Sequence, residues 1–249
     1  MPRLGSALIH YQSVTSTNDV ARDLALAGAP EGAIIIADEQ TAGRGRQGRS
    51  WTSRPGEGLY LSAVLRPRIP AGQSPILALV SAVAVAETLS LDFEIAADIK
   101  WPNDVLASGR KICGILVESA IEGERLTYVV VGIGVNLTQR EFPDEIREHA
   151  TSLLRESGLT VSSKEFAARL LPRLDAMYQM AMSNPPEIVR RWETRSTYAR
   201  GRAVRIFSPD GVLDGTTRGL TENGALVLET DKGEIREIVS GEVTLRPAE

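Results

Sequence analysis

The chain has 249 residues, of which 43 % are hydrophobic and 24 % charged, and its formal net charge is −4. This length and composition predict an ordinary globular protein with one large domain, or a large domain and a small one. The negative net charge argues against a dedicated nucleic-acid binder, which carries an overall excess of basic residues. The only cysteine, Cys113, and the two histidines exclude an internal disulfide and a cysteine-rich zinc site. They argue against a histidine-based metal centre and fit a reducing cytoplasm.

The chain shows neither a secretion signal nor a membrane span. Its first residues lack the apolar core of a signal peptide. The longest apolar stretch, residues 76–85, is interrupted by Ser81 and is too short to cross a bilayer. We therefore expect a cytoplasmic protein without membrane contact.

Strand-like and helix-like segments alternate over the first two hundred residues, which predicts an α/β domain. The predicted strands cover residues 7–14, 33–39, 58–66, 95–101, 111–121 and 126–137. The predicted helices run from a capping segment at 13–18 to about residue 27 and over 75–89, 163–182 and 186–197. Turn signals at Glu122-Gly123 and Ser108-Gly109 predict hairpins at these positions. The alanine-, valine- and leucine-rich segment 75–89 reads as a helix packed on both sides.

Beyond about Arg202 the pattern changes to short strands at 204–207, 212–215, 224–228 and 235–239. Pro-Asp-Gly, Glu-Asn-Gly and Asp-Lys-Gly turns separate them. This pattern predicts a small β-barrel of about fifty residues. We therefore divide the chain into domains at 1–199 and 200–249, with the joint at 198–201.

The segment Gln40–Trp51 carries three arginines that alternate with three glycines, between two strand-like runs. Glycine lets the backbone approach a ligand closely, and each guanidinium offers a planar fork of donors that matches carboxylate or phosphate. The loop therefore suits a small anionic ligand, a polyphosphate in particular. The alternative is an exposed basic loop that touches nucleic acid.

Two further clusters precede or end regular elements. Ser16-Thr17-Asn18 stands at a helix N-terminus, where it can bind a neutral polar group or an anion; simple helix capping is the alternative. In Lys100–Asp104 a proline breaks a strand and sets an amide beside a carboxylate. A common Asx-type turn is the alternative.

Two strands carry the remaining clusters. Lys111 begins a buried strand in which Gly114 leaves space against the sheet, although the strand's first residues could merely be exposed. Gly132 and Gly134 interrupt another strand, which indicates either a close approach by another group or a β-bulge. Arg, Lys, Asn, Asp and glycine gathered at strand ends are what an anionic ligand with an apolar tail requires.

These motifs, taken in order, resemble the biotin protein ligase family. The resemblance covers about residues 10–245, and the Gly-Arg-Gly-Arg-Gln-Gly-Arg and Lys-Trp-Pro-Asn-Asp segments are its most specific parts. It implies a mixed β-sheet flanked by helices, related to class II aminoacyl-tRNA synthetases, followed by an SH3-like barrel. It also implies a ligase that makes biotinyl-5′-AMP from biotin and Mg-ATP. A lysine of a biotin carrier domain, such as that of acetyl-CoA carboxylase, then attacks this anhydride.

The resemblance assigns roles by position. The catalytic residues would be Arg49, Lys111 and Asp104. The biotin-binding residues would be Ser16, Thr17, Asn18, Gln40, Gly43, Arg44, Gly45, Arg46, Lys111 and Gly114. The ATP-binding residues would be Arg46, Arg49, Trp51, Asn103, Asp104, Lys111 and Asn136. Asp104 is a candidate Mg²⁺ ligand or the base that accepts the lysine proton, and Trp51 either covers the adenine or is a core side chain.

Several expectations and alternatives accompany this assignment. Because the chain begins at the first catalytic strand, we expect no N-terminal DNA-binding domain and no DNA partner. Exposed sheet edges permit a homodimer. A lipoate or octanoate transferase of the same superfamily is the main alternative, but the octanoyl type needs a cysteine nucleophile and Cys113 lies inside a strand motif. A non-catalytic biotin or nucleotide sensor comes next, and an RNA binder last.

Overall fold

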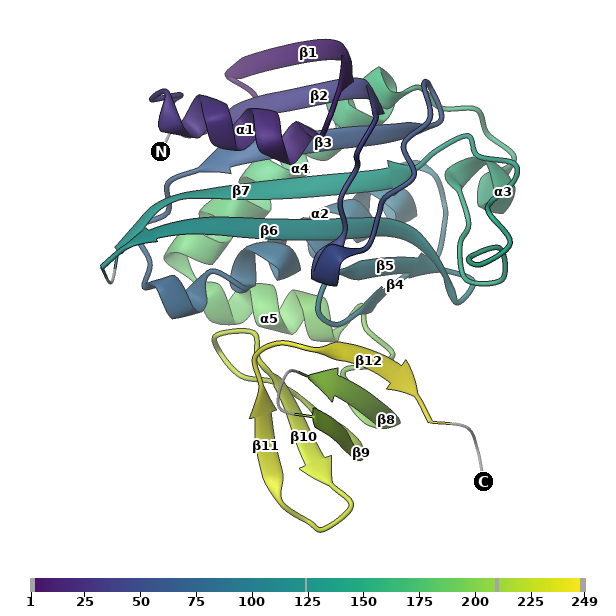
Figure 1. Ribbon diagram of the computed structural model, residues 1–249. Helices are drawn as coiled ribbons and strands as arrows, with labels where there is room; N and C mark the ends of the chain where they lie inside the picture. Colours follow the sequence, from purple (N-terminus) through teal and green to yellow (C-terminus); the bar gives the residue numbers. More distant parts are fainter. Residues whose placement is uncertain (1–2, 124, 209–210, 247–249) are drawn as a thin grey trace.

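The computed structural model describes residues 3–123, 125–208 and 211–246, which form an α/β part and a smaller all-β part (Figure 1). A seven-stranded sheet with the order β1-β2-β3-β7-β6-β5-β4 is the centre of the larger part. β1 and β2 are parallel and every other neighbouring pair is antiparallel, so the sheet is mixed. Its strands are β1 (Ala7–Val14), β2 (Ala33–Gln40), β3 (Gly58–Leu65), β4 (Ala97–Lys100), β5 (Asp104–Ala107), β6 (Arg110–Glu122) and β7 (Arg125–Asn136).

Helices cover both faces of this sheet (Figure 1). α1 (Thr17–Leu26) packs on β2, β3 and β7 over a small cluster that includes Ala21, Ile35 and Val130. On the opposite face lie α2 (Ile76–Asp92), α4 (Ser163–Ser183) and α5 (Pro185–Glu193), while the one-turn helix α3 (Leu153–Ser157) follows the long connection after β7. On its own face of the sheet, α1 packs against β2, β3 and β7, and the connection from β2 to β3 crosses in front of β7 and β6 (Figure 1).

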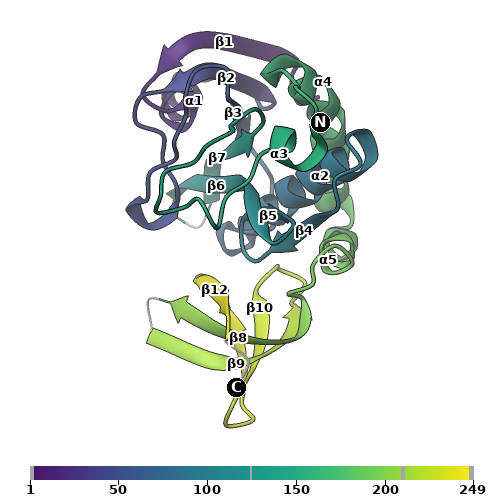
Figure 2. The same cartoon turned by 90° about the vertical axis from the view of Figure 1, so that its right-hand side faces the viewer.

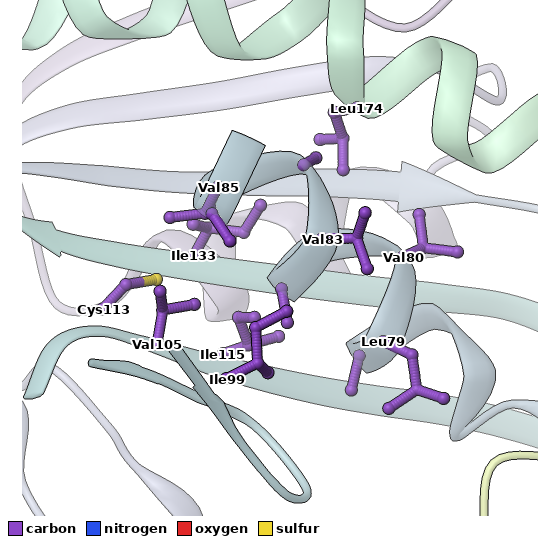
Figure 3. Packing of buried hydrophobic residues seen from close by; sticks show 14 of the residues in the cluster. Leu79, Val80, Val83, Val85, Ile99, Val105, Cys113, Ile115, Ile133 and Leu174 are labelled. Atoms are coloured by element: carbon purple, nitrogen blue, oxygen red, sulfur yellow. The ribbon is translucent and has the colours of Figure 1, made fainter. Parts of the chain in front are cut away.

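The α2 helix is buried on all sides, as its composition predicts. Every residue from Ile76 to Leu89 is buried, because α2 lies between the sheet and the pair α4 and α5. Figure 3 shows side chains of α2 between those of the strands and Leu174 of α4. With the turn before it, Ala71–Asp92 is long and apolar enough to cross a membrane. This holds by length and composition only, for a segment longer than the stretch 76–85 considered in the sequence analysis, and the segment lies in the core.

The smaller part is a five-stranded antiparallel sheet with the order β11-β10-β9-β8-β12. Its strands are β8 (Arg200–Ser208), β9 (Gly211–Leu220), β10 (Leu226–Thr230), β11 (Ile235–Ile238) and β12 (Glu242–Leu245). Figure 2 shows β12 on the side nearest the α/β part. The indole Nε1 of Trp101 donates to the Gly224 carbonyl at 3.1 Å, so the turn before β10 is docked directly on the larger part.

The element predictions were largely confirmed, with identifiable misses. The strand predicted at 95–101 is shorter, because the Pro102-Asn103 turn ends β4 and the unpredicted β5 begins at Asp104. The Ser108-Gly109 and Glu122-Gly123 hairpin signals were correct, and both glycines have positive φ (74° and 60°). β12 and α3 were missed because both are very short. A β-bulge at Gly132 or Gly134 was a wrong alternative, since pairing on both sides of β7 is continuous there.

Candidate active site

Two adjoining hollows lie on the sheet face beside α1, where the connection from β2 to β3 crosses in front of β7 and β6 (Figure 1). The smaller one, here called the head-group pocket, is lined by the start of α1 and by Gln40, Trp51 and the glycines of β6 and β7. The larger one, here called the cleft, has a volume of about 760 Å³. Arg46, Trp51, Asn103 and Lys111 line both, so the two hollows form one continuous site.

Neutral polar side chains furnish the head-group pocket. Ser16 is the N-cap residue of α1, yet its hydroxyl makes no capping hydrogen bond, so capping does not explain its presence. The amide N–H and hydroxyl of Thr17 both donate to Gln40 Oε1, at 2.8 and 3.0 Å. Gln40 Nε2 in turn donates to Ser53 Oγ at 2.9 Å. These bonds fix the orientation of the Gln40 amide at the entrance to the arginine loop.

The strand glycines are required because side chains lie directly on the sheet. A Cβ at Gly132 would stand 2.3 Å from Asn18 Oδ1, and one at Gly134 would stand 2.6 Å from the Trp51 ring. A Cβ at Gly114 would also meet this ring, at 2.8 Å. Along β7 the site therefore passes from Asn18 to Trp51 and then to Asn136, since alternate residues of a strand share one face.

A close ion pair lies between the two hollows. Lys111 Nζ is 2.6 Å from Asp104 Oδ1, and it also stands 5.4 Å from the centre of the Trp51 ring. Both side chains are mostly sheltered from solvent. The ammonium is thus held over the sheet at the point where the head-group pocket opens into the cleft.

The second and third arginines of the loop face the cleft. Arg46 Nη1 donates to Asn103 Oδ1 and to the Gly241 carbonyl, both at 3.2 Å. Burial lowers the pKa of Arg46, against the opposing effect of Asp104, but a guanidinium remains charged at neutral pH. Arg49 forms a two-pronged ion pair with Glu242 of the barrel, with Nη1 at 3.0 Å from Oε1.

The first arginine has different partners. Arg44 donates from Nη1 and Nη2 to the two carboxylate oxygens of Glu118, at 2.9 and 3.0 Å, and from Nη2 to Asp19 at 2.9 Å. Its guanidinium is therefore directed to the rim of the head-group pocket beside α1. The sequence prediction placed Arg44 at the site but did not identify Glu118 or Asp19.

The far end of the cleft is formed by the connection after β7 and by the barrel. Asn136 Nδ2 donates to the Thr151 carbonyl at 2.9 Å, and Gln139 Nε2 donates to Asn136 Oδ1 at 3.3 Å. Sequence reasoning missed the other residues here, because nothing in their local pattern marks them. They include Gln139, Phe142, Ile146, His149, Gly241, Glu242 and Thr244.

Of the residues predicted for the site, all except Gly43 line one of the two hollows. Gly43 lies in the same loop, where its carbonyl accepts from Trp51 N at 2.8 Å. A Cβ on Gly43 would stand 2.4 Å from the Trp51 carbonyl oxygen. Gly43 therefore shapes the loop that carries Trp51.

Neither a metal cluster nor a reactive thiol is found among the described residues. No group of three or more His, Cys, Asp or Glu side chains is placed to hold a metal ion within the part of the chain that the structure describes. Cys113 is fully buried, and burial raises the pKa of its thiol far above the usual range. Burial therefore argues against a thiolate nucleophile at this position, and with it against cysteine-dependent octanoyl transfer.

Comparison with known proteins agrees with this geometry. Residues 10–136 match the biotin/lipoate A/B protein ligase family, and residues 200–246 match the biotin protein ligase C-terminal domain. The chain is 38 % identical over 245 residues to the bifunctional ligase/repressor BirA of Bacillus subtilis, covering 97 % of this chain and 75 % of that protein. It is 36 % identical to the biotin–[acetyl-CoA-carboxylase] ligase of Paracoccus denitrificans, covering 88 % of this chain and 92 % of that enzyme.

A solved structure shows the same likeness. The biotin protein ligase from Aquifex aeolicus in complex with biotin and ATP superposes with a TM-score of 0.82 at 34 % identity, covering 98 % of this chain and 100 % of that one. The two family matches, the similar relatives and the shared fold all indicate one family. The chain belongs to the biotin protein ligases of the biotin/lipoate A/B protein ligase family.

Proposed function

We propose that this protein activates biotin with ATP as biotinyl-5′-AMP and transfers the biotinyl group to a lysine of a carrier domain. One observation carries the proposal. A pocket furnished with neutral polar side chains, with Arg44 at its rim, continues past Trp51 and Lys111 into a cleft lined by Arg46 and Arg49. Biotin has a neutral ureido head, an apolar chain and a terminal carboxylate, and this order of chemistry matches the order of the site.

The head-group pocket would bind the ureido ring. Ser16 offers a hydroxyl that makes no capping hydrogen bond, and Thr17 and Gln40 fix one another at the pocket wall. Trp51 packs directly on Gly134 where the two hollows meet, and the apolar chain of biotin would lie against this ring. The carboxylate would then reach Lys111.

The first step brings two anions together, a carboxylate and the α-phosphate of ATP. Cations fixed at that point offset their repulsion and stabilise the charge of the transition state, and no protein nucleophile is required. Lys111 stands where the two hollows meet, and Arg46 and Arg49 extend into the cleft. We assign Lys111 to the carboxylate and the α-phosphate, and Arg49 to the phosphates. The end of the cleft that contains Asn136 would bind the nucleoside.

Asp104 pairs with Lys111, at the point where we place the reacting atoms. Magnesium enters such sites with the triphosphate, keeps several of its waters and needs only one or two protein oxygens. Asp104 and Asn103 fit that need, because both line the cleft beside the phosphate-binding cations. The metal would shield phosphate charge; in the second step Asp104 would accept the proton of the attacking lysine.

The remaining assignments follow from the same proposal. We propose that the acceptor is a biotin carrier domain of a carboxylase and that the reaction takes place in the cytoplasm, where ATP is available. Because β12 borders the cleft mouth, the barrel would guide the acceptor and steady the nucleotide end. β1 and β4 are the outer strands of the large sheet. The backbone of Ile99 in β4 is already hydrogen-bonded to Arg195 and Ser196, so the β1 edge is the one that would allow a homodimer.

The test is mass spectrometry of a purified biotin carrier domain after incubation with this protein, biotin and Mg-ATP. A mass increase of one biotinyl group on one lysine is the expected result. Lipoate and octanoate, offered in parallel with ATP, should give no product. No mass increase with biotin, together with biotin binding by calorimetry, would identify a sensor and overturn the ligase proposal.

A further inference from the structure

The head-group pocket has a charged rim that the proposed chemistry does not use. Glu118 lies on β6 and accepts hydrogen bonds from two side chains that come from different parts of the chain. Arg44 of the loop donates to both carboxylate oxygens, at 2.9 and 3.0 Å. Asn18 of α1 donates from Nδ2 to Oε2 at 2.7 Å. Glu118, Arg44 and Asn18 are here called the Glu118 clamp.

The clamp leaves Asn18 little capacity for a ligand. Its Nδ2 donates to Glu118 and, at 3.4 Å, to the Leu116 carbonyl. Its Oδ1 accepts from the buried hydroxyl of Ser62 at 2.6 Å. The absence of a Cβ at Gly132 lets the amide lie flat on β7. Asn18 therefore acts as a strut between α1, β3 and β6 within the pocket wall.

The clamp also removes Arg44 from the group of phosphate-binding cations. Asp19 shares the same guanidinium at 2.9 Å, so Arg44 faces two carboxylates on the α1 side of the site. A guanidinium that neutralises two acids adds little positive charge elsewhere. Its position instead fixes the first turn of the loop over the head-group pocket.

We propose that Glu118 is a positioning residue that sets the affinity for biotin, by holding Arg44 and Asn18 as two walls of the head-group pocket. This inference rests on the proposed function and gives the three arginines of the loop different roles. Arg44 closes the pocket for the neutral ring, whereas Arg46 and Arg49 serve the nucleotide. A carboxylate is needed at position 118 because both of its oxygens accept, and an amide would turn an N–H₂ group toward Arg44.

The test compares Glu118→Gln with the wild-type protein by calorimetry, first with biotin alone and then with ATP alone. Biotin affinity should fall about tenfold or more, the equivalent of losing one charge-assisted hydrogen bond, while ATP affinity stays within about twofold. Ser62→Ala, which releases Asn18 Oδ1 and the Thr17 hydroxyl together, should weaken biotin binding in the same selective way. Glu122→Gln, on the same strand but outside both hollows, is the matched control and should change neither affinity.

A double-mutant cycle separates positioning from general stability. Arg44→Ala and Glu118→Ala should each weaken biotin binding, and the double variant should be no weaker than the worse single one, because both remove the same contact. Additive losses, unchanged biotin affinity in Glu118→Gln, or equal loss of biotin and ATP affinity with a lower melting temperature would each overturn the inference. If the wild-type protein itself does not bind biotin, the proposed function fails instead.

Discussion

Arg49 and Glu242 are 193 residues apart in the chain and form a two-pronged ion pair that joins the arginine loop to the barrel. Neither residue is deeply buried, since the side chains are 63 % and 32 % exposed. The hydrogen bond from Arg49 lowers the pKa of Glu242 below its usual range. One end of the proposed phosphate site is therefore held by a residue from outside the catalytic sheet.

This ion pair gives a pH dependence of known sign. A carboxyl whose pKa is lowered in the folded state contributes stability above its unfolded pKa of about 4.3 and loses it as pH falls through the folded value. The free energy of unfolding of the wild-type protein should therefore exceed that of Glu242→Gln above about pH 5. The two should converge in acid, as measured by denaturant titration at several pH values. A constant difference across this range would show that the charge of Glu242 is not responsible.

Lys111 and Arg49 should matter far more for adenylate formation than for folding. Loss of a cation that stabilises the transition state costs about 10²–10³-fold in rate. We expect losses of that order for Lys111→Ala and Arg49→Ala in biotin-dependent pyrophosphate exchange, with small changes in melting temperature. A fall in melting temperature that accounts for the lost activity would make these residues structural.

Asp104 should separate the two half-reactions. Asp104→Asn keeps the shape of the side chain but removes the charge that pairs with Lys111 at 2.6 Å. Biotin affinity should stay close to wild type, while magnesium dependence or transfer to lysine suffers. The measurement is single-turnover transfer from preformed biotinyl-5′-AMP over a range of pH. An unchanged transfer rate and magnesium dependence would remove Asp104 from the mechanism.

Gly134 should tolerate no side chain, because a Cβ there would stand 2.6 Å from Trp51. Gly134→Ala must displace the indole that covers the passage between the two hollows, so we expect biotin affinity to fall about tenfold or more. The matched control is Gly72→Ala, since a Cβ at Gly72 meets nothing within 4 Å. Equal affinities in the two variants would show that Trp51 does not need its present position.

The sequence predicted the sheet strands and the site motifs because each depends on local pattern. β-branched runs, turn dipeptides and the alternation of glycine with arginine are visible within a dozen residues. The N-terminal cluster was also found this way, although only the structure shows that Ser16 makes no capping bond. Strand glycines were correctly linked to a close approach by another group, but the approaching residues, Asn18 and Trp51, could not be identified.

Contacts between segments that are distant in the chain could not be predicted from the sequence. In the sequence Glu118 reads as an ordinary strand residue, and its role appears only when the fold brings Arg44 next to it. Glu242 lies in the four-residue strand β12, too short for any periodicity to appear. The order of partners along the loop, first α1 and β6, then the β4–β5 turn, then the barrel, depends entirely on tertiary structure.

That order has a consequence for how the loop can change in related proteins. Its three arginines form hydrogen bonds with three separate parts of the fold, through Glu118 on β6, Asn103 in the β4–β5 turn and Glu242 on β12. Substitution at Gln47, which is exposed and has a φ of 55°, leaves all three of these contacts in place, and asparagine or glycine would suit its backbone equally well. Adding or deleting a single residue between Arg44 and Arg49 would instead put at least one arginine out of reach of its partner. The length of this segment should therefore be far more constant than its composition.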